Sequence, residues 1–293
     1  MKFLAYLVSG ISLGSIYAII ALGYTMVYGI AKMLNFAHGD VIMVGGYISF
    51  IAANYWGLPV PLSILVAMLV CTVLGIVIEG LAYRPLRSAP SLAVLITAIG
   101  VSYFLQNSAL LIWGANPKVF PSLFAIDTIR LFDGQLVIKP ETLITIAANI
   151  IIMIALTLFI SRTKTGKAMR CVSEDRGAAE LMGINVNRTI SVTFAIGSAL
   201  AAIAGVLLCS SYPILQPTTG SMPGIKAFTA AVFGGIGSIP GAMLGGILLG
   251  VIEIFGKAYI STELGDAIGF AVLIIVLLVK PAGLLGKPMR EKV

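Results

Sequence analysis

Three polar residues near the N-terminus, Asn35, His38 and Asp40, lie between two long apolar runs and are the first candidates for chemistry. They lie in a Gly-containing turn, and a helix broken there exposes N–H groups that can bind a carboxylate, such as that of an amino acid. Polar groups at membrane depth are costly and usually face a cavity or a partner. With Gly39, these residues therefore form a candidate translocation path. The plain alternative is a short, wet loop at the membrane interface, which hydropathy does not distinguish from a path.

Two carboxylates, Glu79 and Glu253, lie inside other apolar runs and could bind a proton or a cation. Each has a basic residue nearby: Arg84 shortly follows Glu79, and Lys257 lies four positions after Glu253. An ion pair with that neighbour is the simpler explanation for both acids. A proton relay is the alternative, and it is the chemistry that an ion-coupled transporter would need.

The sequence lacks the residue sets of most enzymes. His38 is the single histidine and the three cysteines are far apart, so we predict no metal site and no catalytic residues. The segment Gly166–Ala168 does not complete the phosphate-binding pattern G-x-x-x-x-G-K-[ST]. We therefore expect no cofactor in this chain and no ATPase site of its own.

The composition indicates a protein that lies in a lipid bilayer. Of the 293 residues, 59% are hydrophobic and only 11% are charged. A soluble domain has about a quarter charged residues, whereas a helix of about 20 apolar residues crosses a bilayer. A helix also satisfies its own backbone in hydrocarbon. We predict an all-α polytopic membrane protein.

The apolar runs predict about eight or nine membrane segments, some of them discontinuous or re-entrant, in one transmembrane domain over residues 1–293. The runs are Phe3–Tyr28, Val41–Ala53, Val60–Leu81, Leu92–Trp113, Leu143–Ile160, Ile190–Tyr212, the Gly-broken Ala227–Phe255, and Ala267–Val279.

Basic residues predict the orientation, because Lys and Arg concentrate in cytoplasmic loops. They mark as cytoplasmic the loop with Arg84 and Arg87, the insert Ser161–Arg188, and the C-terminus from Lys280 onward. The net charge of +7 therefore indicates orientation and contact with lipid headgroups, and we expect no nucleic-acid partner.

The segments Gly114–Glu141 and Pro213–Gly224 are then expected outside. Counting the membrane crossings back from these segments also places the N-terminus outside, unless Asn35–Asp40 forms a re-entrant turn.

A Gly-rich stretch interrupts Ala227–Phe255. The chain passes from outside at Pro213–Gly224 to inside at Lys280, and Ala267–Val279 accounts for that crossing. The element Ala227–Phe255 must therefore enter the membrane and return to the same side. The turn is expected within Gly234–Gly241, and Ala227–Phe233 is too short to span the bilayer, which predicts a half-helix. Glycines there allow close helix packing. These glycines are Gly234, Gly235, Gly237, Gly241 and Gly245.

The insert Ser161–Arg188 is the one long polar segment between apolar runs. We predict a short helix at Glu174–Met182, with Ser173 as its N-cap, acidic residues in its first turn, and Gly183 just past its end. An isolated helix of this length is marginal in water. It is therefore expected to dock, either on its own membrane domain or in a groove of a partner. A solvated connecting loop is the alternative.

Three motifs together resemble one family. The sequence GAAELMG at Gly177–Gly183 is similar to the Glu-Ala-Ala-x-x-x-Gly loop of ABC importer permeases, with Gly177 in place of the Glu. LNFAHGDVIMVGGY lies near the N-terminus and GGIGSIPGAMLGG near the C-terminus, in the family's order. The chain resembles the branched-chain amino-acid ABC importer permeases nearly end to end, and above all the first of their paired membrane subunits.

The resemblance implies a permease subunit of an ATP-driven importer, multi-pass in a bacterial plasma (inner) membrane. A periplasmic or extracellular binding protein would deliver leucine, isoleucine or valine, and a second permease subunit would complete the path. Two cytoplasmic subunits would bind ATP and magnesium, and the insert would be the coupling helix in their cleft. The implied ATPase-coupling residues are Ser173, Glu174, Asp175, Arg176, Ala178, Ala179, Leu181 and Gly183.

The competing function is an ion-coupled secondary transporter or channel for a small polar solute such as urea or an amide. It would use Glu79 or Glu253 as an ion site, and it leaves the insert without a role.

Overall fold

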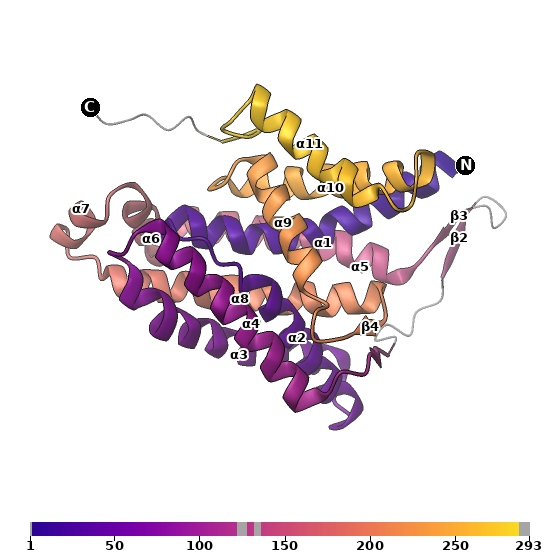
Figure 1. Ribbon diagram of the computed structural model, residues 1–293, viewed down its shortest axis with the longest axis horizontal. Helices are drawn as coiled ribbons and strands as arrows, with labels where there is room; N and C mark the ends of the chain where they lie inside the picture. Colours follow the sequence, from indigo (N-terminus) through magenta and orange to yellow (C-terminus); the bar gives the residue numbers. More distant parts are fainter. Residues whose placement is uncertain (1, 122–127, 132–135, 287–293) are drawn as a thin grey trace. The chain divides into compact units, whose positions relative to one another are not determined.

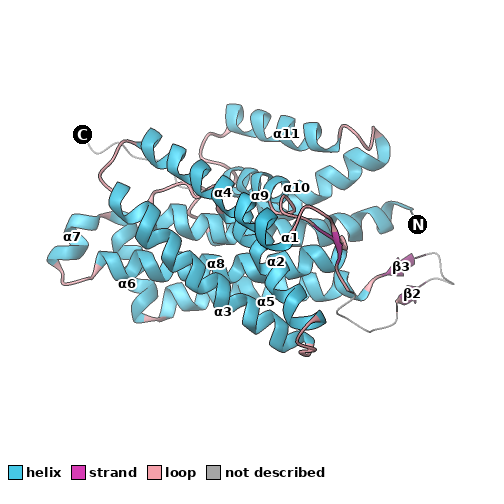
Figure 2. Cartoon of the chain, turned by 60° about the horizontal axis from the view of Figure 1, so that its bottom comes forward, coloured by secondary structure: helices cyan, strands magenta, loops and turns pink. Residues whose placement is uncertain are grey.

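A computed structural model describes residues 2–121, 128–131 and 136–286 (Figure 1). Within these ranges the chain is mostly helical, with short strands in the connections (Figure 2). The helices are α1 (Lys2–Ala31), α2 (His38–Asn54), α3 (Val60–Ile78), α4 (Ser91–Trp113), α5 (Pro140–Arg162), α6 (Lys164–Glu174), α7 (Arg176–Leu181), α8 (Val186–Ser211), α9 (Ser221–Gly234), α10 (Ile239–Tyr259) and α11 (Gly265–Val279). The strands are β1 (Lys118–Val119), β2 (Ile129–Leu131), β3 (Leu136–Ile138) and β4 (Ile214–Leu215).

Helix α3 continues into a π-helical turn, Glu79–Tyr83, and a 3-10 turn, Arg84–Leu86. Parts of the predicted outer segment Gly114–Glu141, and the last basic residues of the predicted cytoplasmic C-terminus, lie outside the described residues.

The helices follow the apolar runs of the sequence. Among the described residues, six are long and apolar enough to cross a membrane: α1, α3 with its extension to Leu86, α4, α5, α8 and α10. Helix α11, with 15 residues, is a shorter apolar helix, and α2 and α9 have 17 and 14 residues. The chain is thus an all-α polytopic membrane permease fold. Its short helices α2 and α9 lie where the sequence predicts discontinuous segments.

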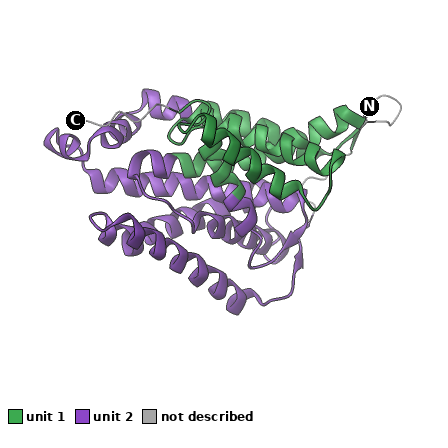
Figure 3. Cartoon of the chain, turned by 45° about the horizontal axis from the view of Figure 1, so that its top comes forward, with its two compact units in different colours: residues 1–25, 124–154, 226–293 green, residues 26–123, 155–225 purple. Residues whose placement is uncertain are grey.

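Packing divides the chain into two units (Figure 3). Unit 1 contains residues 1–25, 124–154 and 226–293, and unit 2 contains residues 26–123 and 155–225. Each unit is built from segments that are far apart in the sequence, so neither corresponds to one continuous stretch of chain.

In unit 2, helices α2, α3 and α8 form the packed centre. They approach closely because small residues lie where they touch: a Cβ on Gly45 would lie 2.6 Å from the Ala202 Cα, and Gly75 faces Ser198. Such contacts favour helix association in lipid, where apolar burial alone provides no driving force. Helix α8 is largely buried, whereas most of α4 is exposed, as expected for a lipid-facing helix.

Two segments that the sequence predicts on the outer side meet in unit 2. Strand β1 pairs antiparallel with β4, with Lys118 opposite Leu215. One strand belongs to Gly114–Glu141 and the other to Pro213–Gly224, so the pairing agrees with a common side for both.

In unit 1, the N-terminal part of α1 packs against α10 through glycines. A Cβ on Gly10 would lie 2.8 Å from the Val251 Cα, and one on Gly14 would lie 2.6 Å from the Ile247 Cα. A larger side chain at either glycine would push the two helices apart.

The Gly-rich stretch forms the connection between α9 and α10. Gly235 and Gly237 have φ angles of +104° and +94°, in the left-handed region that glycine tolerates. A Cβ on Gly241 would lie 2.5 Å from the Gly234 carbonyl oxygen, and Gly245 also faces the backbone of α9. The two helices therefore touch backbone to backbone.

The last described residues complete the end of α9. The Leu284 and Leu285 N–H groups donate to the Phe233 and Gly234 carbonyls, each at 2.9 Å. Carbonyls in the last turn of a helix have no partner within the helix, so this segment supplies one.

Replacing Gly45 with Ala should lower the free energy of unfolding by about 1–3 kcal/mol, because the new Cβ overlaps the backbone of α8. Thermal unfolding of the purified protein in lipid nanodiscs measures the effect. Gly100→Ala in α4 is the matched control: a Cβ there meets no atom within 4 Å, so equal or higher stability is expected. Equal losses in the two variants would contradict the packing argument.

Candidate functional site

The chain leaves the helical path between α1 and α2. Lys32 has a φ of +53°, which is unusual for a residue with a side chain. Helix α2 then begins at His38, and Ala37 at the N-cap position provides no side-chain hydrogen bond. No side chain caps α2; the His38 and Asp40 N–H groups donate instead to the Asn35 and Ala37 carbonyls, at 3.1 and 3.0 Å.

The polar residues at this break are buried. Asn35 is 4% exposed, His38 1% and Asp40 2%. Their burial disagrees with the alternative of a wet interfacial loop. Buried polar groups need hydrogen-bond partners from the protein.

A polar cluster surrounds Asp40. The Gln106 Nε2 lies 2.9 Å from the Asp40 Oδ1 and 3.3 Å from the hydroxyl oxygens of both Ser102 and Ser221. Ser102 and Gln106 lie on α4, and Ser221 is the first residue of α9. The amide therefore joins α2, α4 and the start of α9 within unit 2.

Close backbone contact accompanies the cluster. A Cβ on Gly39 would lie 2.7 Å from the Gly220 carbonyl oxygen. The N-terminal ends of α2 and α9 thus meet beside a carboxylate. Helix N-terminal ends favour anions and a carboxylate favours a cation, so the arrangement has the chemistry to hold both charged ends of a zwitterion.

Neither Ser102 nor Gln106 is among the residues predicted from the sequence. Both are polar residues inside the apolar run Leu92–Trp113, and their spacing of four places them on one face of α4. That spacing was the available signal. It does not tell which neighbour the polar face meets.

The insert forms two helices in place of the single helix predicted at Glu174–Met182. Asp175 separates α6 from α7 and has an extended backbone with φ −155°. Its carboxylate accepts a hydrogen bond from the Ala178 N–H at 3.0 Å and so caps α7.

The predictions for Ser173 and Glu174 were therefore wrong in detail. Ser173 lies in the last turn of α6, where its hydroxyl donates to the Arg170 carbonyl at 2.7 Å, and Glu174 ends that helix instead of starting the next. Ser and Asp are both favoured N-cap residues, so composition alone does not select between Ser173 and Asp175.

The C-terminal end of α7 agrees with the sequence. Gly183 has a φ of +80°, and its N–H donates to the Glu180 carbonyl at 2.9 Å. The Ile184 N–H donates to the Ala179 carbonyl at 3.0 Å. These two bonds form a Schellman motif, for which glycine is the usual residue.

Helix α7 has an inner and an outer face. Ala179 is buried, and the Arg176 guanidinium donates to the Ala31 carbonyl at the end of α1. Leu181 and Met182 are 90% and 81% exposed at the other end of the helix. The helix is thus docked on its own unit while it presents an apolar tip.

Glu79 is buried and pairs with Arg87, so the pair predicted with Arg84 was wrong. The Ser191 hydroxyl on α8 donates to the second carboxylate oxygen at 2.6 Å.

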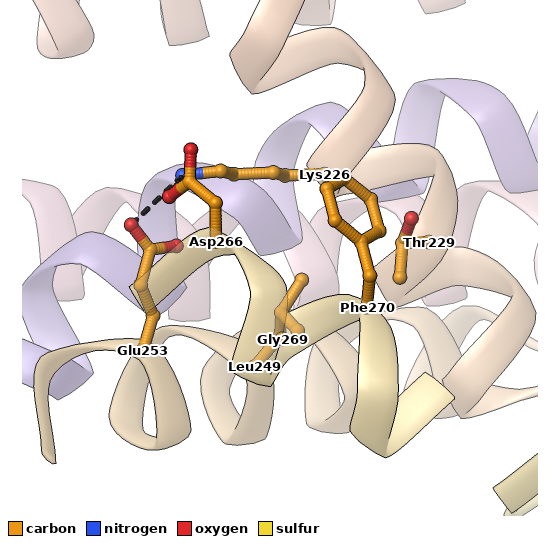
Figure 4. A pocket seen from close by; sticks show the side chains of 7 residues that line it. All are labelled: Lys226, Thr229, Leu249, Glu253, Asp266, Gly269 and Phe270. Carbon is orange, nitrogen blue, oxygen red and sulfur yellow. Dashed lines mark hydrogen bonds and ion pairs between the residues drawn. The ribbon is translucent and has the colours of Figure 1, made fainter. Parts of the chain in front are cut away.

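Glu253 is buried and is the centre of a partly exposed ionic cluster in unit 1 (Figure 4). Its Oε1 accepts from Lys226 Nζ at 2.8 Å and from Lys257 Nζ at 2.5 Å, and its Oε2 accepts from the Tyr17 hydroxyl at 2.9 Å. Lys226 also pairs with Asp266 at 2.7 Å. The two positive and two negative charges cancel, and the predicted pair of Glu253 with Lys257 is present.

The cluster lines a tight pocket whose other walls are Thr229, Leu249, Gly269 and Phe270 (Figure 4). Its centre has no room for a water molecule, so it is a packed charge network. Lys226 was not predicted, although a lysine within the apolar sequence of α9 is itself a signal. Over the described ranges of the chain, no group of three or more His, Cys, Asp or Glu residues could hold a metal ion.

Sequence comparison relates the chain to known transport proteins. Residues 6–277 match the family described as branched-chain amino acid transport system / permease component. The chain is 48% identical to the high-affinity branched-chain amino acid transport system permease protein LivH of Escherichia coli (strain K12), covering 100% of this chain and 98% of LivH. It is 47% identical to the corresponding protein BraD of Pseudomonas aeruginosa, covering 99% and 98% of the two chains.

A solved structure shares the fold. It is that of PsaBC from Streptococcus pneumoniae in complex with Fab, with a TM-score of 0.51 and 15% identity, and the match covers 96% of this chain and 93% of that chain.

Replacing Glu253 with Gln should lower the free energy of unfolding by about 3–5 kcal/mol, because it leaves an excess positive charge in a buried site. Adding Lys226→Met to this variant removes the excess charge and should recover part of the loss. Thermal unfolding of both variants in nanodiscs measures the difference. A double variant less stable than Glu253→Gln alone would show that charge balance is not what holds the cluster.

Proposed function

The chain belongs to the family of branched-chain amino acid transport system permease components, and from this premise we propose that it is the membrane-spanning permease subunit of an ATP-driven importer. Its cargo is leucine, isoleucine or valine, and its membrane is the bacterial plasma (inner) membrane. The observation that carries the proposal is the 48% identity over the full chain to permease proteins of high-affinity branched-chain amino acid transport systems.

The energy enters through partner subunits. Two cytoplasmic ATP-binding subunits hold ATP and magnesium, and α7 is the coupling helix that fits their cleft. The exposed tip of Leu181 and Met182 supports this role, because a short helix with an uncovered apolar end suits a groove in another protein. The capping carboxylate of Asp175 and the Schellman turn at Gly183 keep the tip in a fixed conformation.

The cargo arrives from the outer side. A periplasmic or extracellular amino-acid-binding protein delivers it, and a second permease subunit forms the other wall of the path. The ribbon of β1 and β4 contributes to the surface on which the binding protein docks, because it joins the two segments expected outside.

Asn35, His38, Gly39 and Asp40 contribute to the path. Asp40 attracts the ammonium group of an amino acid, and the dipole at the N-terminal end of α2 attracts its carboxylate. Contacts of this kind must be weak, because the cargo only passes through the protein.

Two experiments test the function together. The tagged chain is purified from its native membrane, and the ATP-binding and permease chains that accompany it are identified. The complex is then reconstituted in vesicles with the binding protein, and ATP-dependent uptake of labelled leucine is expected. Uptake of leucine, urea or an amide by the chain alone, driven by an ion gradient, would favour the ion-coupled transporter and overturn the proposal.

Replacing both Leu181 and Met182 with Ser should weaken binding of the ATP-binding subunits by about 2 kcal/mol or more, roughly a thirtyfold loss, because buried apolar anchors dominate interfaces. Pull-down of those subunits from nanodiscs measures the loss. Val119→Ser, which alters an equally exposed apolar residue on β1, is the control and should leave this binding unchanged. Normal association of the double variant would contradict the coupling role of α7.

Replacing Asp40 with Asn keeps the size of the side chain and a bond to Gln106, but it removes the negative charge. The KM for leucine uptake should rise about tenfold, since a charge-assisted bond exceeds a neutral one by roughly this factor. Ser49→Ala, at another buried position of α2, is the control. An unchanged KM would remove Asp40 from the path.

A further inference from the structure

Parts of four elements meet in unit 2 at the end of the bundle predicted to be cytoplasmic: the end of α1, the π-helical turn Glu79–Tyr83, helix α7 and the first turns of α8. A π-helical turn is rare, and such turns are frequent at functional sites. Here the turn carries two buried polar side chains, Glu79 and Tyr83, that reach in different directions.

Glu79 ties the turn to α8. One carboxylate oxygen accepts from Arg87, and the other accepts from the Ser191 hydroxyl at 2.6 Å. Arg87 donates at the same time to the Asn187 side-chain oxygen. Because the insert ends in the first turn of α8, a displacement of the insert acts on these bonds.

Tyr83 ties the turn to the break between α1 and α2. Its hydroxyl donates to the Asn35 Oδ1 at 2.9 Å, and its ring packs against Phe194 with centroids 5.2 Å apart. The side chain is 1% exposed, so the hydroxyl has no water to replace Asn35.

Arg176 binds the other end of the connection between α1 and α2, since its guanidinium donates to the carbonyl of Ala31, the last residue of α1. Burial lowers the pKa of Arg176, and the positive charge of Arg87 lowers it further.

Residues 32–37 are thus held at Ala31 by α7 and near Asn35 by the π-helical turn. Between the two attachments lies Lys32, in a left-handed conformation that costs a residue with a side chain about 1 kcal/mol or more. A strained connector held at both ends responds to displacement of either end.

We propose that Glu79 and Tyr83 are positioning residues that transmit movement of the insert to the break between α1 and α2, and so to the candidate path at Asp40. This inference rests on the proposed function, because the movement originates in partner subunits that bind α7. The transmission runs from the insert to the start of α8, through Glu79 and Tyr83, to Asn35.

Tyr83→Phe is the smallest change that tests the contact between the π-helical turn and Asn35. It keeps the ring against Phe194 and removes only the hydroxyl that binds Asn35. Tyr47→Phe is the matched control: Tyr47 is also a buried tyrosine, and among the described residues its hydroxyl has no hydrogen-bond partner. Glu79→Gln is the second variant, since it keeps the shape and weakens the bonds to Arg87 and Ser191.

The first measurement is amide hydrogen exchange of residues 33–41 in the full chain in nanodiscs. Exchange in Tyr83→Phe and Glu79→Gln should be about tenfold faster than in the wild type, and Tyr47→Phe should not differ. Unchanged exchange in Tyr83→Phe, or an equal increase in Tyr47→Phe, overturns the link whatever the protein transports.

The second measurement is leucine uptake per ATP hydrolysed by the complete transporter in vesicles. This ratio should fall about tenfold in Tyr83→Phe while the binding of the ATP-binding subunits is retained. An unchanged ratio together with faster exchange shows a purely structural contact and overturns the inference. If the wild-type complex itself shows no ATP-driven uptake, the proposed function fails and the transmission role fails with it, whereas the exchange result still reports the physical link.

Discussion

Hydrocarbon provides no hydrogen bonds, so each interruption of a helix must be satisfied by other parts of the protein. Between α1 and α2, Arg176 supplies a donor to the Ala31 carbonyl, and Tyr83 and Gln106 supply donors to the side chains of Asn35 and Asp40. At the end of α9, the segment around Leu284 supplies the backbone donors. These partners come from α7, the π-helical turn after α3, helix α4 and the C-terminal region, so segments far apart in the sequence meet at the interruptions.

The buried charges obey the same constraint. Glu79 has Arg87 and Ser191 as partners, and Glu253 has two lysines and a tyrosine. A carboxylate engaged on both oxygens has little capacity left for a transported ion. The structure therefore gives these acids a role in holding helices together, which agrees with a transporter whose energy comes from elsewhere.

Local sequence determined the helices because a span needs only length and hydrophobicity, and glycine turns such as Gly235 and Gly237 follow from backbone conformation. Contacts between helices were less accessible. Glu79 pairs with Arg87 and not with the nearer Arg84, and Lys226 pairs with Glu253 from 27 positions away. Likewise, Asp175 and not Ser173 caps α7, since the cap is fixed by where α6 ends. The pairing of Lys226 with Glu253 depends on how α9 packs against α10, which no short stretch of sequence specifies.

The glycine contact between α1 and α10 has a consequence for biosynthesis. Gly10 leaves the ribosome long before Val251, its neighbour in the finished protein. At about 5–20 residues per second, this interval is on the order of ten to fifty seconds. During that time the glycine face of α1 is without its final partner, so the cell's insertion machinery or the surrounding lipid must accommodate that face until α10 has been made.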